Sequence, residues 1–302
     1  MKEKTNISSQ ALATLQALFV TFLWSTSWVL IKIGLKDIPA LTFAGLRYFI
    51  AFLILVPLYI RSNSTMPIKQ MKRYHWGWLV GLGLLYYGLT QGSQFVGLAY
   101  LPAITFSLLL NFTAPIVAIL GTTFLNEKLS RSQWGGIAVF LVGALIYFSP
   151  VLIPSGLIFG FVIAGVHIMA TSLSSIAGRF INRTNELDAL TVTVWSMGIG
   201  SAVLLLAGIL IEGVPALSSK DWMIIIWLAA VNTALAFTLW NHTLRTLSAA
   251  QSSMINNTML IQIAVLAWLF LGEQISWQQG IGMAIAALGA VMVNLKRPQE
   301  KR

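Results

Sequence analysis

Long apolar runs alternate with short polar segments along almost the whole chain. A helix needs about 20 mainly apolar residues to cross a bilayer. Pro102 and the proline-containing segment Ser149–Gly156 divide two runs that are too long for one helix. The pattern predicts ten spanning helices: Ala11–Ile31, Leu41–Ile60, Trp76–Leu98, Ile104–Leu125, Trp134–Phe148, Gly156–Ile176, Ala189–Ile211, Trp222–Thr243, Ala249–Leu271 and Ile281–Asn294.

The composition indicates an all-α integral membrane protein. Hydrophobic residues make up 57% of the 302 residues and charged residues only 9%, whereas a soluble domain carries about 25% charged residues. Transmembrane β-barrels show alternating segments of ~10 residues, so the long apolar runs argue against a barrel. The chain has no cysteine, which excludes disulfides and cysteine metal sites. Ala11–Ile31 is longer than the ~7–15-residue core of a signal peptide, so we expect an uncleaved first span.

The net charge is +10, and the distribution of the lysines and arginines indicates which side of the membrane each loop faces. With a cytoplasmic N-terminus, the inner segments hold fifteen lysines and arginines and the outer segments three, Lys32, Lys36 and Lys220. Cytoplasmic loops of membrane proteins carry this excess. We therefore expect a protein of the cytoplasmic (inner) membrane with both termini in the cytoplasm. Because the positive charge is explained by this orientation, we do not expect nucleic acid as a partner.

The two halves of the chain repeat at a constant offset of 146 residues. The repeat predicts two five-helix units, residues 1–150 and 151–302. An odd number of spans makes the second unit enter the membrane upside down, so the fold class predicted is ten transmembrane helices as two inverted-topology repeats. The matched pairs are Ser107/Ser253, Asn111/Asn257, Phe124/Phe270, Leu125/Leu271, Glu127/Glu273, Ser130/Ser276, Gln133/Gln279, Gly136/Gly282 and Gly143/Gly289.

Three motifs make the chain similar to the EamA family of the drug/metabolite transporter superfamily. The first span holds "LWSTSWVLIK" (Leu23–Lys32), and the second begins with "IPALTFAGLRY" (Ile38–Tyr48). The most specific motif is the repeated block "FLNEKLSRSQWGGIAVFLVGA" and "FLGEQISWQQGIGMAIAALGA". The resemblance covers the whole chain and implies transport of small organic metabolites, often outward. Pro115 of the first copy is replaced by Ile261 in the second.

Polar residues within the predicted spans are candidates for a substrate path, because such groups usually face a bundle interior or a water-filled cavity. Helical spacing places Thr21, Ser25, Trp28 and Lys32 on one stripe and Tyr87, Gln91 and Gln94 on another. The full set of path candidates is Trp24, Ser25, Trp28, Tyr87, Gln91, Gln94, Asn111, His167, Trp240 and Asn257, with Lys32 and Arg47 as charged candidates.

Each candidate also has a structural interpretation. Hydroxyls in such helices commonly bond to their own backbone, and amides can tie helices together. His167 is either a packed neutral histidine or a proton carrier, and Lys32 can extend to the outer interface. Glu127 and Glu273, at helix ends, fit loop or cap roles, and the four repeated glycines fit close packing. Arg47 either pairs with an acid such as Asp37 or attracts an anionic group.

Asn111 and Asn257 each lie seven residues past the start of equivalent helices, Ile104 and Ala250. At 1.5 Å per residue they reach ~10 Å into a core of ~30 Å. Inverted-repeat transporters bind substrate near the midplane, so we expect these amides to contact it.

The function expected is secondary transport by alternating access, with export of amino acids or drug-like compounds. The sequence has no phosphate-binding loop and no hydrolase motif, so we expect no cofactor, no metal and no enzyme activity. A membrane receptor or enzyme that reuses the fold is the alternative. The partners expected are a small-molecule substrate and the lipid bilayer. Oligomeric state, substrate, direction and coupling stay open: uniport, exchange and coupling through His167 all fit.

Overall fold

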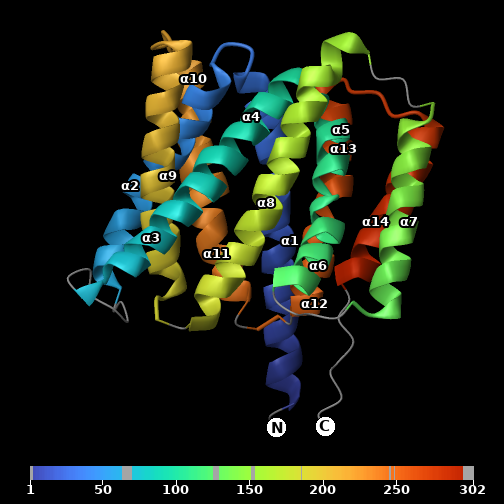
Figure 1. Ribbon diagram of the computed structural model, residues 1–302, viewed down its shortest axis with the longest axis horizontal. Coiled ribbons are helices and arrows are strands. Elements are labelled where there is room, and N and C mark those ends of the chain that lie inside the picture. Colours follow the sequence, from blue (N-terminus) through green and yellow to red (C-terminus); the bar gives the residue numbers. More distant parts are fainter. Residues whose placement is uncertain are drawn as a thin grey trace. The chain divides into compact units, whose positions relative to one another are not determined.

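The computed structural model describes residues 3–62, 70–124, 129–150, 154–184, 186–244, 246–247 and 249–294, and these ranges contain helices and no strand (Figure 1). The elements are α1 (Glu3–Gly34), α2 (Ala40–Arg61), α3 (Arg73–Leu82), η2 (Gly83–Thr90), α4 (Gln91–Tyr100), α5 (Ala103–Leu110), α6 (Thr113–Phe124), α7 (Arg131–Phe148), η3 (Ser155–Leu157), α8 (Ile158–Thr184), α9 (Ala189–Glu212), α10 (Ser219–Ala229), η4 (Ala230–Leu235), α11 (Ala236–Thr243), α12 (Ala249–Asn257), α13 (Met259–Leu271) and α14 (Trp277–Asn294).

Eight helical segments among the described residues are long and apolar enough to cross a membrane. They coincide with the predicted spans, apart from the third and the tenth. The third is helical from Arg73 to Tyr100 but consists of α3, η2 and α4, and the tenth overlaps a shorter apolar helix, Trp277–Val293. The protein is therefore multi-pass, and its described residues are all-helical; the count of ten remains a prediction.

The chain divides into two compact units that interleave along the sequence. The first unit holds residues 1–29, 103–155 and 236–302, and the second holds residues 30–102 and 156–235. These two units group residues that pack together in space. The two sequence repeats, which meet at residue 150, are defined along the chain, and that division stays a prediction.

In the first unit, α7 and α14 pack with their backbones in close contact (Figure 1). A Cβ atom on Gly136 would lie 2.9 Å from the carbonyl oxygen of Gly289, and one on Gly143 would lie 2.7 Å from that of Gly282. Position 136 thus faces 289 while 143 faces 282, so the two helices run antiparallel. The expectation that these four glycines serve packing is confirmed, since any side chain would hold the backbones apart.

In the second unit, α2 packs along α9, and η2 packs on α9 and α8. The Glu212 carboxylate at the end of α9 accepts hydrogen bonds from the backbone N–H groups of Leu41 (3.0 Å) and Thr42 (2.9 Å). These N–H groups lie in the first turn of α2, where no carbonyl of the helix can accept from them. Glu212 therefore caps α2 from a neighbouring helix.

Two predicted spans contain a break that periodicity did not indicate. The span Ile104–Leu125 is divided into α5 and α6 by a turn at Asn111–Phe112, and Ala249–Leu271 is divided into α12 and α13 at Thr258. The break at Asn111 has a local cause: Pro115 has no N–H for the Asn111 carbonyl, and its ring collides with that carbonyl. The second break has Ile261 at the equivalent position, so its cause lies elsewhere.

Two further spans contain π-helical segments, η2 and η4. The Thr90 hydroxyl donates to the carbonyl of Leu85 at 3.0 Å, and Thr233 donates to that of Leu228 at 2.8 Å, in both cases five residues back. Subtracting 146 from the bounds of η4 gives 84–89, which lies inside η2. Interruptions of this kind inside α-helices are frequent at functional sites.

Candidate functional site

The second unit buries a cationic and aromatic cluster, called here the Arg47 cluster (Arg47, Tyr48, Gln91, Phe95 and Thr233). Arg47, only 5% exposed, donates from Nε to the Thr233 hydroxyl at 3.0 Å. Its guanidinium carbon lies 5.1 Å from the Tyr48 ring centroid and 6.0 Å from that of Phe95. A guanidinium at this distance is attracted by an aromatic ring. The cluster thus holds a positive charge among apolar rings, a setting that strengthens its attraction for anions.

The rest of the cluster is a hydrogen-bonded pair. The Tyr48 hydroxyl donates to Gln91 Oε1 at 2.7 Å. The Tyr48 ring also contacts the buried Tyr87 ring, with centroids 5.7 Å apart. Two sequence candidates, Gln91 and Tyr87, therefore lie beside Arg47, while Gln94 is half-buried on α4.

The acid suggested as a partner for Arg47 lies elsewhere. The Asp37 carboxylate is 3.9 Å from the Lys220 ammonium, and both side chains are exposed. Lys32 also has a defined role. Its ammonium donates to the carbonyls of Leu98 (2.5 Å) and Leu101 (2.7 Å), so it stabilises the C-terminal end of α4, where carbonyls lack helical partners.

His167 of α8 is buried against the end of η2. Its Nδ1 lies 2.9 Å from the Thr90 carbonyl oxygen, and because a carbonyl only accepts, Nδ1 carries the proton. Nε2 is 3.4 Å from the Thr171 hydroxyl. The histidine therefore ties α8 to the π-helical segment, which agrees with the packed interpretation of this residue.

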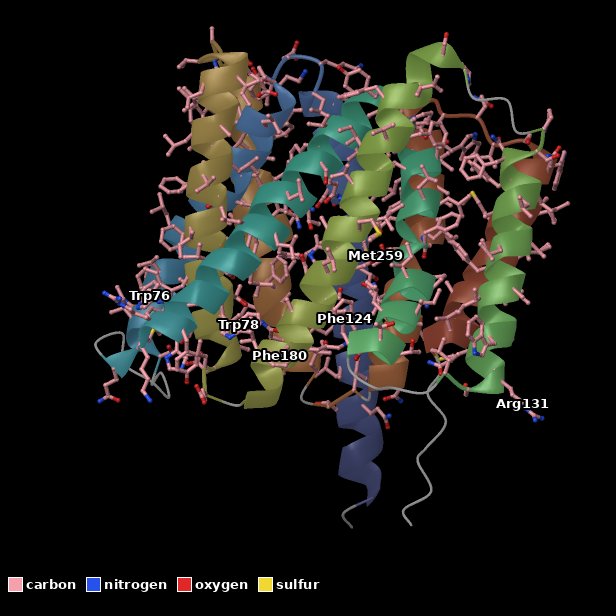
Figure 2. All side chains as sticks on the ribbon, in the orientation of Figure 1. Trp76, Trp78, Phe124, Arg131, Phe180 and Met259 are labelled. Carbon is pink, nitrogen blue, oxygen red and sulfur yellow. The ribbon has the colours of Figure 1, made fainter. Side chains whose placement is uncertain are left out.

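Nearer the ends of the spans, α3 and α8 meet through aromatic rings. The rings of Trp78 and Phe180 lie with centroids 5.3 Å apart, and both residues are labelled in Figure 2. Trp76, also labelled there, packs against Trp195 of α9 at 5.4 Å. These tryptophans fit the aromatic belt expected at a membrane–water interface.

The first unit contains a polar network around a residue that sequence reasoning missed, called here the Gln262 network (Thr21, Ser25, Thr258 and Gln262). The Ser25 hydroxyl donates to Gln262 Oε1 at 2.9 Å. Gln262 Nε2 lies 3.2 Å from the Thr21 hydroxyl and 3.0 Å from that of Thr258. A single glutamine in the apolar run "MLIQIAVLAWLFL" was the available signal.

This network accounts for the break between α12 and α13. Thr258, the residue at the break, donates its hydroxyl to the Ile255 carbonyl at 2.6 Å and accepts from Gln262. Since Gln262 is also bonded to Ser25 of α1, side chains from another helix stabilise this break. No proline is needed.

The tryptophan candidates lie close to this network along α1. The Trp24 ring contacts Trp240 and Phe237 of α11, with centroids 5.1 and 5.7 Å apart. Trp28 is buried against Phe106 of α5, at 5.8 Å. Trp24 and Trp240 are only half-buried, so part of their surface is available for contact.

The two asparagine candidates differ from each other. Asn111 donates from Nδ2 to the Ser107 carbonyl of the preceding helix α5 at 2.8 Å. The Asn257 Nδ2 is buried and has no hydrogen-bond partner among the described residues. Several hydroxyls within the spans bond to carbonyls of their own helix, as the structural interpretation expected, among them Ser107, Thr171, Ser174 and Ser175.

The glutamates at the repeat ends were expected to fix loops or caps. Glu273 accepts hydrogen bonds from the N–H groups of Ala103 (2.6 Å) and Ile104 (2.9 Å), at the start of α5, which confirms this for Glu273. Its counterpart Glu127 lies outside the described residues.

Comparison with known proteins adds the family. The sequence profile of the EamA-like transporter family matches residues 11–149 and again residues 155–295. The chain is 28% identical over 288 residues to "Uncharacterized transporter YoaV" of Bacillus subtilis (strain 168). That alignment covers 90% of this chain and 93% of the relative. It is 25% identical over 299 residues to "Probable amino-acid metabolite efflux pump" of Salmonella typhimurium, covering 92% and 93%.

The fold is also found among solved structures. A chain described as "Crystal structure of protein" aligns with a TM-score of 0.68 over 94% of this chain and 97% of its own length. The sequence identity is 17%, so the likeness shows the fold alone.

Proposed function

This chain belongs to the EamA-like transporter family, and we propose that it exports small organic metabolites, amino acids or drug-like compounds, across the cytoplasmic membrane by alternating access. That it is a membrane transporter follows from the family and from the apolar helices. The substrate class, the direction and the mechanism are the proposed part. The printed name of the Salmonella typhimurium relative, an amino-acid metabolite efflux pump, supports the direction and the substrate class.

One observation carries the proposal: polar side chains gather where the spanning helices are interrupted. Thr233 of the Arg47 cluster lies in η4, and Tyr87 beside it lies in η2. In the first unit, Thr258 of the Gln262 network lies at a helix break. Transporters commonly form their substrate sites from discontinuous helices, because the released backbone groups and nearby polar side chains can bind a solute.

Alternating access by inverted repeats is supported by counterpart positions. The breaks in the two halves are followed by helices that begin at Thr113 and Met259, residues 146 apart. The helices α7 and α14, whose glycines are counterparts, run antiparallel, as a two-fold axis in the membrane plane requires. Equivalent helix starts also share their caps: Gln133 accepts from the N–H of Ser130, and Gln279 from that of Ser276, both at 3.0 Å.

Arg47 gives the proposal a chemical preference. A buried guanidinium flanked by rings suits the carboxylate of an amino acid better than a cation. We propose that zwitterionic or acidic substrates pass the Arg47 cluster. We also propose that both termini of the protein lie in the cytoplasm.

The test is flux in proteoliposomes, with amino acids compared with the amines that lack their carboxylate. Arg47→Ala should slow amino-acid flux roughly tenfold or more, the effect of losing one charge-assisted hydrogen bond, and should slow amine flux much less. Thr233→Val is the matched control, because it removes the partner of Arg47 Nε but keeps the charge. Equal loss for amines and amino acids would assign Arg47 a structural role only.

A further inference from the structure

The two asparagines that the repeat places at equivalent positions are not equivalent in their hydrogen bonding. Asn111 lies in the turn between α5 and α6, a break that Pro115 imposes through its covalent structure. Its amide nitrogen donates to the Ser107 carbonyl at 2.8 Å, one of the carbonyls left without a helical partner near that break. The amide N–H of Asn111 is therefore used within the fold.

Asn257 precedes a break that is stabilised in a different way. There the Thr258 hydroxyl donates to the carbonyl of Ile255. The side-chain amide of the neighbouring Asn257 does not take this role. Gln262 bonds to Thr258 at 3.0 Å, and Ser25 bonds to Gln262 at 2.9 Å. These three side chains stabilise the break without using the amide of Asn257.

The amide nitrogen of Asn257 is buried, yet it has no hydrogen-bond acceptor among the described residues. Folded proteins leave few buried donors in this condition, because the lost hydration is not compensated. The fold thus leaves the amide N–H of Asn257 unpaired, whereas it pairs that of Asn111. A ligand that supplies an acceptor would remove the cost of the lost hydration.

An apolar cluster lies against one face of α12. Ile255 and Trp240 pack on the same apolar cluster, formed by Ala13, Ala17 and Leu247. Trp240 contacts Trp24 with ring centroids 5.1 Å apart. This cluster lies on the Ile255 face of α12, and Asn257, two residues further on, lies on a different face of the same helix.

We propose that Asn257, and not Asn111, is the amide that binds the substrate, and that it donates to a hydrogen-bond acceptor of the substrate, a carboxylate in the case of an amino acid. This assignment rests on the proposed transport function and narrows it. The two halves of the chain then differ in role, with one asparagine maintaining a helix end and the other recognising the solute.

The first part of the test needs no ligand. Asn111→Leu and Asn257→Leu are compared in lipid nanodiscs by thermal unfolding, followed by tryptophan fluorescence. Asn111→Leu removes a hydrogen bond and should lower Tm by about 2–4 °C, the shift expected for a ~1 kcal/mol loss in a chain of this size class. Asn257→Leu removes a donor without an acceptor, so its Tm should equal or exceed that of the wild type. A fall as large as that of Asn111→Leu would overturn the proposal.

The second part uses paired probes: phenylalanine with phenethylamine, and leucine with isoamylamine. The amino acid of each pair should raise the Tm of the wild type and of Asn111→Leu, and the amine should not. Asn257→Leu and Asn257→Asp, which both lack the N–H donor, should lose that rise. A rise retained in both Asn257 variants would overturn the assignment.

The two proposals fail in different ways. If no amino acid raises the wild-type Tm, the carboxylate assignment is wrong, and amine flux in proteoliposomes then decides whether the transport proposal stands. If amino acids bind and are transported equally well by Asn257→Leu, transport stands and only the role of Asn257 is wrong.

Discussion

At the scale of single residues, charges inside this protein mostly stabilise helix ends. Lys32 donates to carbonyls at the end of α4, and Glu212 and Glu273 accept from N–H groups at the starts of α2 and α5. Each sign matches the partial charge of the helix end it contacts. Arg47, by comparison, donates to the Thr233 hydroxyl and lies close to two aromatic rings.

A pH prediction follows from the exposed Glu186, in the segment between α8 and α9. Hydrogen bonds from Tyr74 and from His75, the latter at 2.7 Å, hold the pKa of the Glu186 carboxyl below its usual range. A carboxyl more acidic in the folded state stabilises that state at pH above its unfolded pKa, about 4.3. This stabilisation is lost as pH falls through the lowered folded pKa.

Thermal unfolding between about pH 5 and pH 3 checks this. The Tm of the wild type should fall more steeply than that of Glu186→Gln, which cannot titrate. Tyr74→Phe keeps the carboxyl but removes the donor that lowers its folded pKa most, so its loss of Tm should be smaller and should be complete at a higher pH. Parallel curves for all three proteins would mean that this contact contributes nothing to stability.

Periodicity identified which side chains share a helix face but not their partners. The stripe Thr21, Ser25, Trp28 and Lys32 was predicted as one set. In the structure, Thr21 and Ser25 join Gln262, while Trp28 packs on Phe106. Gln262 was missed because it is isolated in an apolar helix, and only tertiary contact gives it a role.

At the scale of helices, the sequence predicts where a helix exists and roughly where it ends, but it predicts less well whether the helix is broken. The fifth and tenth spans were expected at Trp134 and Ile281 and begin at Arg131 and Trp277, because polar residues there cap the first turn. The break at Asn111 is traceable to Pro115. The break at Thr258 is invisible to local rules, since contacts from α1 stabilise it.

A matched pair of glycines tests the contact between α7 and α14. A Cβ on Gly136 would lie 2.7 Å from the backbone nitrogen of Val293, whereas one on Gly135 would meet only the Met292 methyl carbon at 3.8 Å. Gly136→Ala should therefore destabilise by about 1–3 kcal/mol. Gly135→Ala should be neutral or stabilise by up to about 1 kcal/mol through helix propensity. Denaturation of both variants in the same detergent decides, and equal effects would contradict the close contact.

At the scale of the whole molecule, orientation is the most direct prediction. The chain has no cysteine, so single cysteines can be introduced without background. Ser64→Cys should react with a membrane-impermeant maleimide only from the cytoplasmic side, and Ala216→Cys only from the outside. Reaction of Ala216→Cys from the cytoplasm alone would contradict the inverted arrangement.

The glycine contact also bears on ancestry. Gly136 and Gly282 are counterparts, as are Gly143 and Gly289, yet Gly136 packs on Gly289 and Gly143 on Gly282. This exchange is the reciprocity that two identical subunits show around a two-fold axis. A half-length polypeptide with one such helix would already carry a self-complementary surface, provided that its copies inserted in opposite orientations. Gene duplication and fusion would then free the two halves to diverge, as Pro115 and Ile261 have done.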